Sequence, residues 1–312
     1  MYALLPLSWA RAYVAQPDYR DIALPFSRIR WVTFADIPYE YSLQAVYDHL
    51  KLSYPDGFVI RGCSVTMAEY FAADNCQTVK TGAEAVLDLQ GQHLENPLVA
   101  GPAGRALKRG AVIEVEMHEA NLLKLEAFRK ETRHAGKPQL QHVFRDKPST
   151  SCRCFVFQAH TGEWLAAITI SERGKLEVHT EVMLKRYKAS ADVMEGLIAG
   201  IFEILRREGI KEWSLGEVPF RMLLQISPQQ LTPLERLMVS MASLWKHAYD
   251  FEGLYHFKNK FKPEWRPVIL CGNKALSPFM LAELAVAMGF TDLMLHKSAL
   301  LLKEQFFPGW AT

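Results

Sequence analysis

The chain lacks a long uninterrupted apolar run. A membrane-spanning helix needs about 20 consecutive, mostly apolar residues. The longest clean apolar run covers residues 164–170, and a longer candidate at 193–205 contains acidic residues. The N-terminus carries no charged region ahead of its few apolar residues, so it does not have the pattern of a secretory signal. We therefore expect no membrane-spanning segment.

Cysteine is scarce, and the common metal and nucleophile motifs are missing. The five cysteines include no Cys-x-x-Cys pair, which favours a reducing cytoplasm over a disulfide framework. Cys152 and Cys154 alternate in a strand-like run and are predicted to be buried small apolar residues. The ten histidines are scattered, and no His-Glu-x-x-His, Gly-x-Ser-x-Gly or Walker loop occurs. No metal site can be nominated from this pattern.

A large excess of one charge is also absent. Lys and Arg number 36 against 34 Asp and Glu, for a formal net charge of +2. Attraction of the whole molecule to nucleic acid or anionic lipid is therefore not indicated, and any such binding needs a local patch. The length of 312 residues suits one large domain or two of about 150 residues.

Strand-like and helix-like segments alternate along most of the chain, which is typical of an α/β protein. Strands are expected at 57–61, 86–89, 112–117, 152–159, 164–171, 175–180, 213–215 and 268–271. Helices are expected at 119–134, at 193–208, from Thr232 onward, and from Ser277 to Gly289. The polar segment 136–151 is the best junction, and predicts domains at 1–137 and 138–312.

A basic and aromatic run at 256–266 is the strongest local feature. Four fixed positive charges (Lys258, Lys260, Lys262 and Arg266) stand against Glu264 alone, a local charge of +3, and three aromatic residues are interleaved with them. This composition suits a phosphate or carboxylate flanked by a stacking surface. The alternative is a solvated loop that Phe257, Phe261 and Trp265 pin to the core.

Two carboxylates open the helix expected at 193–208. Asp192 is followed three residues later by Glu195, which is the pattern of a capping box. That structural interpretation explains both residues without any catalytic role.

Several segments, taken in order, resemble the C-terminal domain of phosphatidylglycerol lysyltransferases and their soluble relatives. The most specific is DFEGLYHFKNKFKPEWRPVIL, which looks like the family's Gly-Leu, Phe-Lys-x-Lys-Phe, Pro-x-Trp signature. ADVMEGLIAGIFEILRREGIKEWSLGEVPF looks like its Asp-led helix and the following strand, and GAEAVLDLQGQHLENPLVAGPAGRALKRGAVIEV is more loosely similar. The resemblance covers residues from about 57 to 290, while the first 55 residues are not placed by it.

The resemblance implies an α/β fold of two tandem GNAT-like domains, with mixed sheets flanked by helices. It also implies transfer of an aminoacyl group from aminoacyl-tRNA to a hydroxyl or amine acceptor, a lipid such as phosphatidylglycerol in the best-known members. No metal or redox cofactor is implied. Such a protein would be cytoplasmic, with peripheral contact with anionic lipid at the inner face of the membrane. The donor amino acid, the acceptor and the oligomeric state stay open.

The resemblance also assigns candidate site residues. Asp192 takes the position of the family's functional aspartate, and is expected to accept the proton of the attacking group. Lys258 and Lys260 match the signature lysines, with Lys258 expected to stabilise the developing oxyanion or the leaving ribose. In an extended segment these two lysines would share one face.

Further candidates are expected to bind substrate. Trp265 matches the family's tryptophan, and Arg266 closes the same basic run. Glu195 stands where the family has an arginine, which would disturb binding of an anionic head group. Glu217 lies in the Leu-Gly-x-x-Pro turn, and the family does not supply it.

Two other functions remain open from the sequence. An acyl-CoA N-acyltransferase would bind pyrophosphate through a glycine-rich loop at a helix N-terminus, but the segment LKRYKASADV contains no glycine. Lys185, Arg186 and Lys188 lie close by and partly offset the carboxylates there. A non-catalytic module that binds tRNA or protein is the third alternative.

Overall fold

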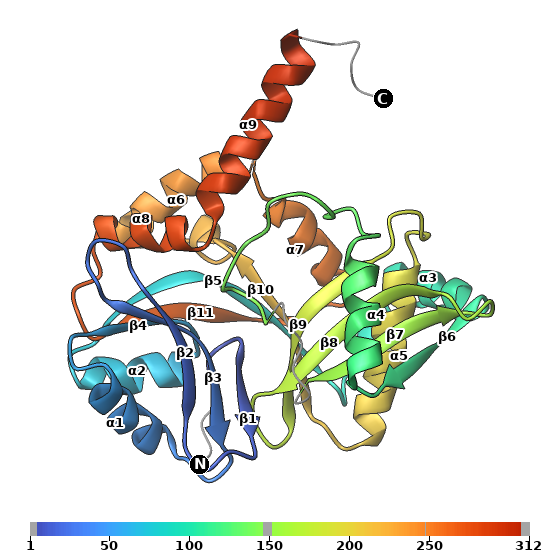
Figure 1. Cartoon of the computed structure of the whole chain (residues 1–312), viewed down its shortest axis with the longest axis horizontal. Coiled ribbons are helices and arrows are strands. Elements are labelled where there is room, and N and C mark those ends of the chain that lie inside the picture. The colour runs from blue at the N-terminus through green and yellow to red at the C-terminus, as the bar shows by residue number, and fades with distance from the viewer. Residues whose placement is uncertain (1–4, 146–151, 247, 307–312) are drawn as a thin grey trace.

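The structure is a computed structural model that describes residues 5–145, 152–246 and 248–306. Eleven strands of this part form one mixed sheet in the order β1-β3-β4-β11-β5-β10-β9-β8-β7-β6, with β2 paired to β3 (Figure 1). The strands are β1 (Trp9–Ala12), β2 (Asp18–Ala23), β3 (Arg30–Pro38), β4 (Phe58–Cys63), β5 (Gln77–Asp88), β6 (Gly110–Val115), β7 (Arg153–Ala159), β8 (Trp164–Glu172), β9 (Glu177–Lys185), β10 (Glu212–Pro219) and β11 (Glu264–Gly272).

Helices cover both faces of this sheet. They are α1 (Leu43–Ser53), α2 (Val65–Ala73), α3 (Pro97–Leu107), α4 (Glu119–Arg129), α5 (Val193–Arg207), α6 (Pro233–Trp245), α7 (Phe251–Asn259), α8 (Pro278–Ala287) and α9 (Phe290–Phe306). In the half with β3, β4, β5 and β11, α1 and α2 pack on one face, and α6 and α8 on the other. In the other half, α3 and α5 share a core with the sheet, while α4 covers the opposite face. Figure 1 shows α9 extending away from the body.

The predicted α/β fold is confirmed in its mixed sheet and flanking helices. All eight predicted strands overlap observed strands, and the helices expected at 193–208, after Thr232 and from Ser277 to Gly289 are α5, α6 and α8. Thr232 and Glu235 form the reciprocal capping box that their spacing predicts. The five cysteines, all in the described part of the chain, are buried and form no disulfide there, which confirms the burial predicted for Cys152 and Cys154.

One predicted helix and the basic run differ from the sequence-based expectations. The helix expected at 119–134 ends at Arg129, because the following turn brings Thr132 to a bridge with Arg186, and Glu131 accepts a hydrogen bond from the amide of Tyr187. The run 256–266 is neither one loop nor one extended segment. It is the end of α7, a turn, and the start of β11.

The two halves of the chain interleave within the sheet. β6 precedes the predicted boundary but pairs with β7, and β11 lies between β4 and β5. The structure describes the first part of the predicted junction, up to Arg145. The side chain of Arg145 is buried, and its Nη1 lies 2.8 Å from Oδ1 of Asp36. Residues 146–151 lie outside the described part. The division into 1–137 and 138–312 stays a prediction.

Among the described residues, no single helix is long and apolar enough to cross a membrane. α8 and the first part of α9 are together long and apolar enough to cross a membrane, although the two helices are bent by 69° relative to each other.

Candidate functional site

A gap between two parallel strands lies at the centre of the candidate site. β9 and β10 pair only from Glu177 to His179 and from Glu212 to Ser214, and the register of β10 on β5 then shifts before Glu217. Gly216 follows with a φ of +88°, a value that favours glycine. The gap therefore begins where β10 stops pairing with β9.

Lys258 fills this gap from α7. Its Nζ donates to the carbonyl oxygen of Glu217 at 3.1 Å, and a Cβ built on Gly216 would be 3.5 Å from the same Nζ. The side chain is buried, and burial lowers the pKa of Lys258 to about 7, although the charges of Glu217 and Glu84 oppose this shift. Near neutral pH the amine therefore exists in both its charged and its neutral form.

His179 lines the same gap from β9. Its Nδ1 is 3.3 Å from the hydroxyl of Ser214, and burial, reinforced by nearby cations, lowers the pKa of His179 well below its usual range. Thr180 next to it accepts a hydrogen bond from the indole of Trp213 at 2.9 Å. His179 therefore stays neutral at physiological pH, and Lys258 is the group in the gap that titrates there.

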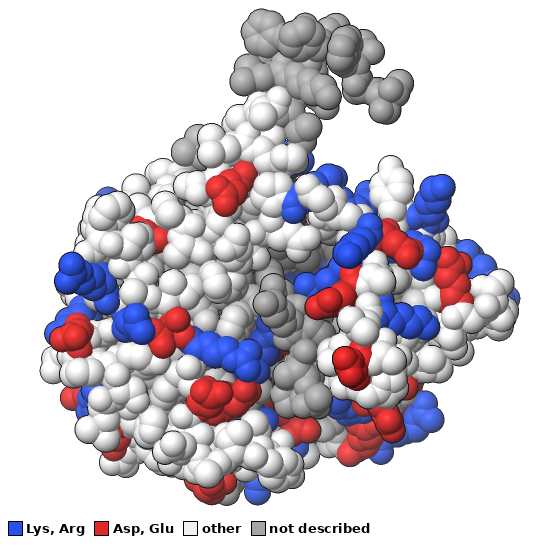
Figure 2. Space-filling view, in the orientation of Figure 1, with Lys and Arg blue, Asp and Glu red and all other residues white. Residues whose placement is uncertain are grey.

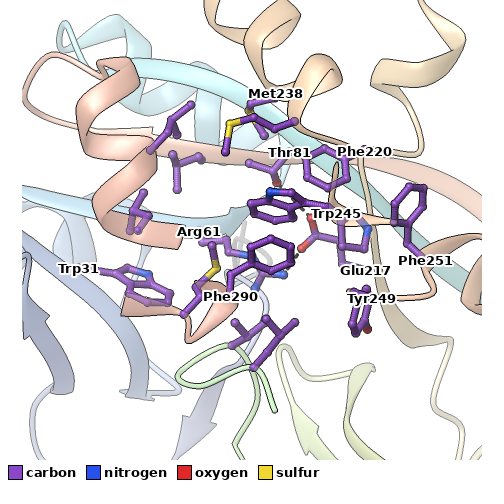
Figure 3. A pocket seen from close by; sticks show the side chains of 18 residues that line it. Trp31, Arg61, Thr81, Glu217, Phe220, Met238, Trp245, Tyr249, Phe251 and Phe290 are labelled. Carbon is purple, nitrogen blue, oxygen red and sulfur yellow. Dashed lines mark hydrogen bonds and ion pairs between the residues drawn. The ribbon is translucent and has the colours of Figure 1, made fainter. Parts of the chain in front are cut away.

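Glu217 joins the gap to an apolar cavity. Its carboxylate accepts a hydrogen bond from Thr81 Oγ1 at 3.1 Å and pairs with the guanidinium of Arg61. The same side chain lines a cavity of about 90 Å³, and Figure 3 shows Arg61 and Glu217 together among its aromatic walls. Tyr249 also lines the cavity, and burial raises its pKa to about 12, so its hydroxyl stays protonated.

The predicted capping box of α5 does not form. Asp192 has helical backbone angles and makes no side-chain cap. Its carboxylate instead pairs with Arg109, which lies between α3 and β6, and is 3.7 Å from Arg105 of α3. It also accepts a hydrogen bond from the hydroxyl of Ser190 at 2.7 Å. Burial raises the pKa of Asp192, but the bonds from Ser190 and Arg109 outweigh burial and lower it overall.

Glu195 binds a lysine of the basic run. Lys260 Nζ donates to Glu195 Oε1 at 2.9 Å, while Oε2 has no hydrogen-bond partner among the described residues. Because Lys258 lies inside α7 and Lys260 is its C-cap, the two lysines do not share one extended face. They contact Glu217 and Glu195, so the structure places these four predicted residues along the α5–α7–β10 contact.

Arg266 and Trp265 bind other parts of the protein. The guanidinium of Arg266 makes bonds of 2.6 and 2.7 Å to Glu212 and one of 2.7 Å to Glu264, and these carboxylates raise its pKa. The Trp265 ring lies 5.1 Å from that of Tyr255 and donates to Asn259. The +3 run is therefore largely neutralised within the fold, and Figure 2 shows basic and acidic side chains intermixed over the half that contains α4.

Arg61, Thr81 and Tyr249 were not among the residues that the sequence indicated. They come from β4, β5 and the segment before α7, and only the fold brings them to Glu217. One sequence signal was available for Arg61, because it is the single charged residue of the otherwise apolar strand Phe58–Cys63.

The fold is similar to that of two solved structures. L-PGS from Bacillus licheniformis aligns with a TM-score of 0.65 and 16% identity, over 90% of this chain and 88% of that one. The C-terminal domain of a putative lysylphosphatidylglycerol synthetase from Agrobacterium fabrum aligns with a TM-score of 0.64 and 18% identity, over 88% and 85% of the two chains. At these identities the likeness concerns the fold alone.

The sequence identifies the family. The profile described as "Phosphatidylglycerol lysyltransferase, C-terminal" matches residues 52–272, and the chain belongs to this family of transferases. A curated relative, the lysylphosphatidylglycerol biosynthesis bifunctional protein LysX of Gordonia bronchialis, is 24% identical over 251 residues. That match covers 74% of this chain and 22% of LysX, so the chain spans less than a quarter of the relative's length.

Proposed function

We propose that this protein transfers an aminoacyl group from aminoacyl-tRNA to a hydroxyl or amine acceptor, with a phosphatidylglycerol-like lipid as the first candidate. The observation that carries the proposal is Lys258, a buried amine with a pKa of about 7, in the strand gap of a chain that belongs to a lysyltransferase family. Aminoacyl-tRNA would be a co-substrate, and no metal or redox cofactor is required.

The chemistry needs positioning and one proton acceptor. The ester on the tRNA is already activated, so the acceptor's oxygen or nitrogen can attack its carbonyl carbon directly. In its neutral form Lys258 takes the proton of the attacking group, the ester bond to the ribose breaks, and the same proton passes to the ribose oxygen that leaves. The products are the aminoacylated acceptor and a tRNA with a free terminal hydroxyl.

Asp192 is the alternative proton acceptor. The sequence favoured it, but its lowered pKa and its pairing with Arg109 make it a weaker base than Lys258 at neutral pH. We propose that Asp192 instead holds Arg109 and Arg105 near the N-terminus of α5, where they attract phosphate of the tRNA. Under this assignment Asp192→Asn weakens tRNA binding and leaves the maximal rate within about tenfold of wild type. A loss of at least a hundredfold in that rate would return the catalytic role to Asp192.

The other predicted residues have supporting roles in this proposal. Glu217 holds Lys258 through its carbonyl oxygen, and Glu195 holds Lys260 at the end of α7. Trp265 and Arg266 fix the start of β11 against α7 and β10, so any contact they make with substrate is indirect.

Labelled aminoacyl-tRNAs test the reaction and its acceptor. The protein is incubated with a charged tRNA pool and a cell extract, and the label is partitioned between organic and aqueous phases. Label in the organic phase supports a lipid product reached by peripheral membrane contact from the cytoplasmic side. Label in a small aqueous product supports a soluble acceptor, and absence of any transfer contradicts the proposal.

An acyl-CoA N-acyltransferase is the second candidate function. The segment LKRYKASADV that leads into α5 contains no glycine, so it lacks the glycine-rich loop that would bind the pyrophosphate of CoA at the helix N-terminus. A shift in melting temperature with CoA would favour this enzyme, and we expect none. Salt-sensitive tRNA binding without transfer would instead favour a non-catalytic module.

A further inference from the structure

The cavity beside Glu217 is apolar over most of its wall. Its lining comes from both sequence halves and includes Phe220, Met241, Trp245, Leu284 and Phe290. Figure 3 shows the rings of Phe220, Trp245 and Phe290 around the centre of the cavity. Such a wall favours an uncharged apolar occupant.

The polar groups of the cavity are few and nearly balanced in charge. Arg61 and Glu217 form an ion pair, and the hydroxyl of Thr81 also donates a hydrogen bond to Glu217. The hydroxyl of Tyr249 is neutral. This end of the cavity therefore carries no net charge, but it offers carboxylate oxygens that can accept further hydrogen bonds.

The polar end is also the link to the reaction site. Glu217 lines the cavity with its carboxylate, and the carbonyl oxygen of the same residue holds Lys258 in the strand gap. If the reacting carbonyl group of a substrate lies at Lys258, the atoms bonded to its carbonyl carbon are close to the cavity, because Glu217 contacts both Lys258 and the cavity.

We propose that this cavity receives the side chain of the transferred aminoacyl group, and that it selects an uncharged, apolar amino acid instead of lysine. The inference rests on the proposed aminoacyl transfer. The ester carbonyl would lie at Lys258, the α-amino group would donate to the carboxylate of Glu217, and the side chain would enter the apolar cavity.

Lysine is a poor occupant for electrostatic reasons. Its ammonium would enter a space with apolar walls, and burial of an unpaired charge is strongly unfavourable. The carboxylate of Glu217 is already engaged by Arg61 and Thr81, and the α-amino group of the substrate would take its remaining acceptor position, so it is not free to pair with a side-chain ammonium. An apolar side chain has no such penalty.

The size of the cavity favours a side chain over a lipid chain. An engineered apolar cavity of about 150 Å³ binds benzene, and this cavity of about 90 Å³ is smaller. It suits a branched aliphatic side chain, while a long acyl chain would need the wall to move.

Amino acid ethyl esters are soluble probes of this site, because they reproduce the ester, the α-amino group and the side chain. Calorimetric titration of the full chain at pH 7 compares the ethyl esters of leucine and lysine. We expect leucine ethyl ester to bind at least tenfold more tightly. Equal or tighter binding of lysine ethyl ester overturns the inference.

Two opposite changes at Met241 test the location. Met241→Trp fills the cavity and should reduce binding of leucine ethyl ester at least tenfold, whereas Leu295→Trp, at an exposed position on α9, should not change it. Met241→Ala enlarges the cavity and should shift the preference toward phenylalanine ethyl ester. This second variant keeps the test decisive if the filled protein does not fold. Unchanged preferences in the folded variants place the side chain elsewhere and contradict the inference.

Competition with a short-chain phosphatidylglycerol shows whether the cavity binds a lipid chain or an aminoacyl side chain. If dihexanoyl phosphatidylglycerol displaces leucine ethyl ester and loses affinity in Met241→Trp, the cavity holds lipid and the inference is wrong. If the esters bind as expected but no aminoacyl-tRNA supports transfer, the proposed function fails while the selectivity of the cavity stands. If transfer occurs with lysine preferred over leucine, the inference alone fails.

Discussion

At the scale of single residues, Lys258 combines full burial with a titration near neutral pH. Its pKa is lowered because the folded protein withholds water from the ammonium, which donates a hydrogen bond to a backbone carbonyl. The sequence could predict that this lysine matters, through its place in the Phe-Lys-x-Lys-Phe segment. It could not predict burial, because the gap beside Gly216 exists only once β9 and β10 diverge.

The free energy of unfolding should depend on pH because of this buried amine. In the unfolded chain Lys258 titrates near 10.4, and in the folded protein near 7. Between these values the unfolded state binds more protons, so the contribution of Lys258 raises stability by about 1.4 kcal/mol per pH unit as pH rises. Urea unfolding at pH 7 and pH 9 should show this gain in wild type and a smaller one in Lys258→Met. Equal gains in both proteins would show that Lys258 is not buried as an amine with a lowered pKa.

At the scale of elements, α5 and α7 meet through Glu195 and Lys260. Glu195 is 4% exposed, so its carboxylate depends on the ammonium of Lys260 for compensation. The sequence predicted α5 from its apolar stripe, but read Asp192 and Glu195 as one local cap. Spacing alone cannot show that the two side chains leave in different directions, toward α3 and α7.

Removal of Lys260 should therefore destabilise the protein. Lys260→Met leaves a buried carboxylate unpaired, which we expect to lower the free energy of unfolding by about 2 to 4 kcal/mol. Adding Glu195→Gln should restore more than half of that loss, because the neutral amide removes the buried charge. Lys262→Met, at an exposed position in the same run, is the matched control and should change stability by less than about 0.5 kcal/mol. Chemical denaturation of the four proteins measures these differences, and no rescue by Glu195→Gln contradicts the pairing.

At the scale of the whole molecule, buried ion pairs connect the two halves of the sheet. Arg173, the residue that follows β8, pairs with Glu84 of β5 and donates to the carbonyl oxygen of Leu5 at 2.7 and 2.9 Å. Local periodicity predicted most strands, but the order of strands depends on contacts between residues distant in sequence. The placement of β11 between β4 and β5 and the pairing of β6 with β7 are therefore results of the structure.

The connection between the halves can be tested by removing one charge. Arg173→Met leaves Glu84 buried and unpaired, and we expect a loss of about 3 to 5 kcal/mol in the free energy of unfolding. The control is Arg206→Ala, which breaks a half-exposed pair with Glu203 within α5 and should lose less than about 1 kcal/mol. Equal losses in the two variants would contradict a structural role for the buried pair.

Lys258, which titrates near neutral pH in the gap between β9 and β10, is also the proposed proton acceptor. One rate measurement therefore tests the account most directly. Transfer of label from aminoacyl-tRNA to acceptor is followed from pH 6 to pH 8.5 in wild type and in Lys258→Arg, whose guanidinium cannot deprotonate. The account predicts a wild-type rate that rises with a midpoint near pH 7, and a rate at least a hundredfold lower in Lys258→Arg that no longer rises at this midpoint. Equal rates in the two proteins, or no transfer from any aminoacyl-tRNA by the wild type, would contradict it.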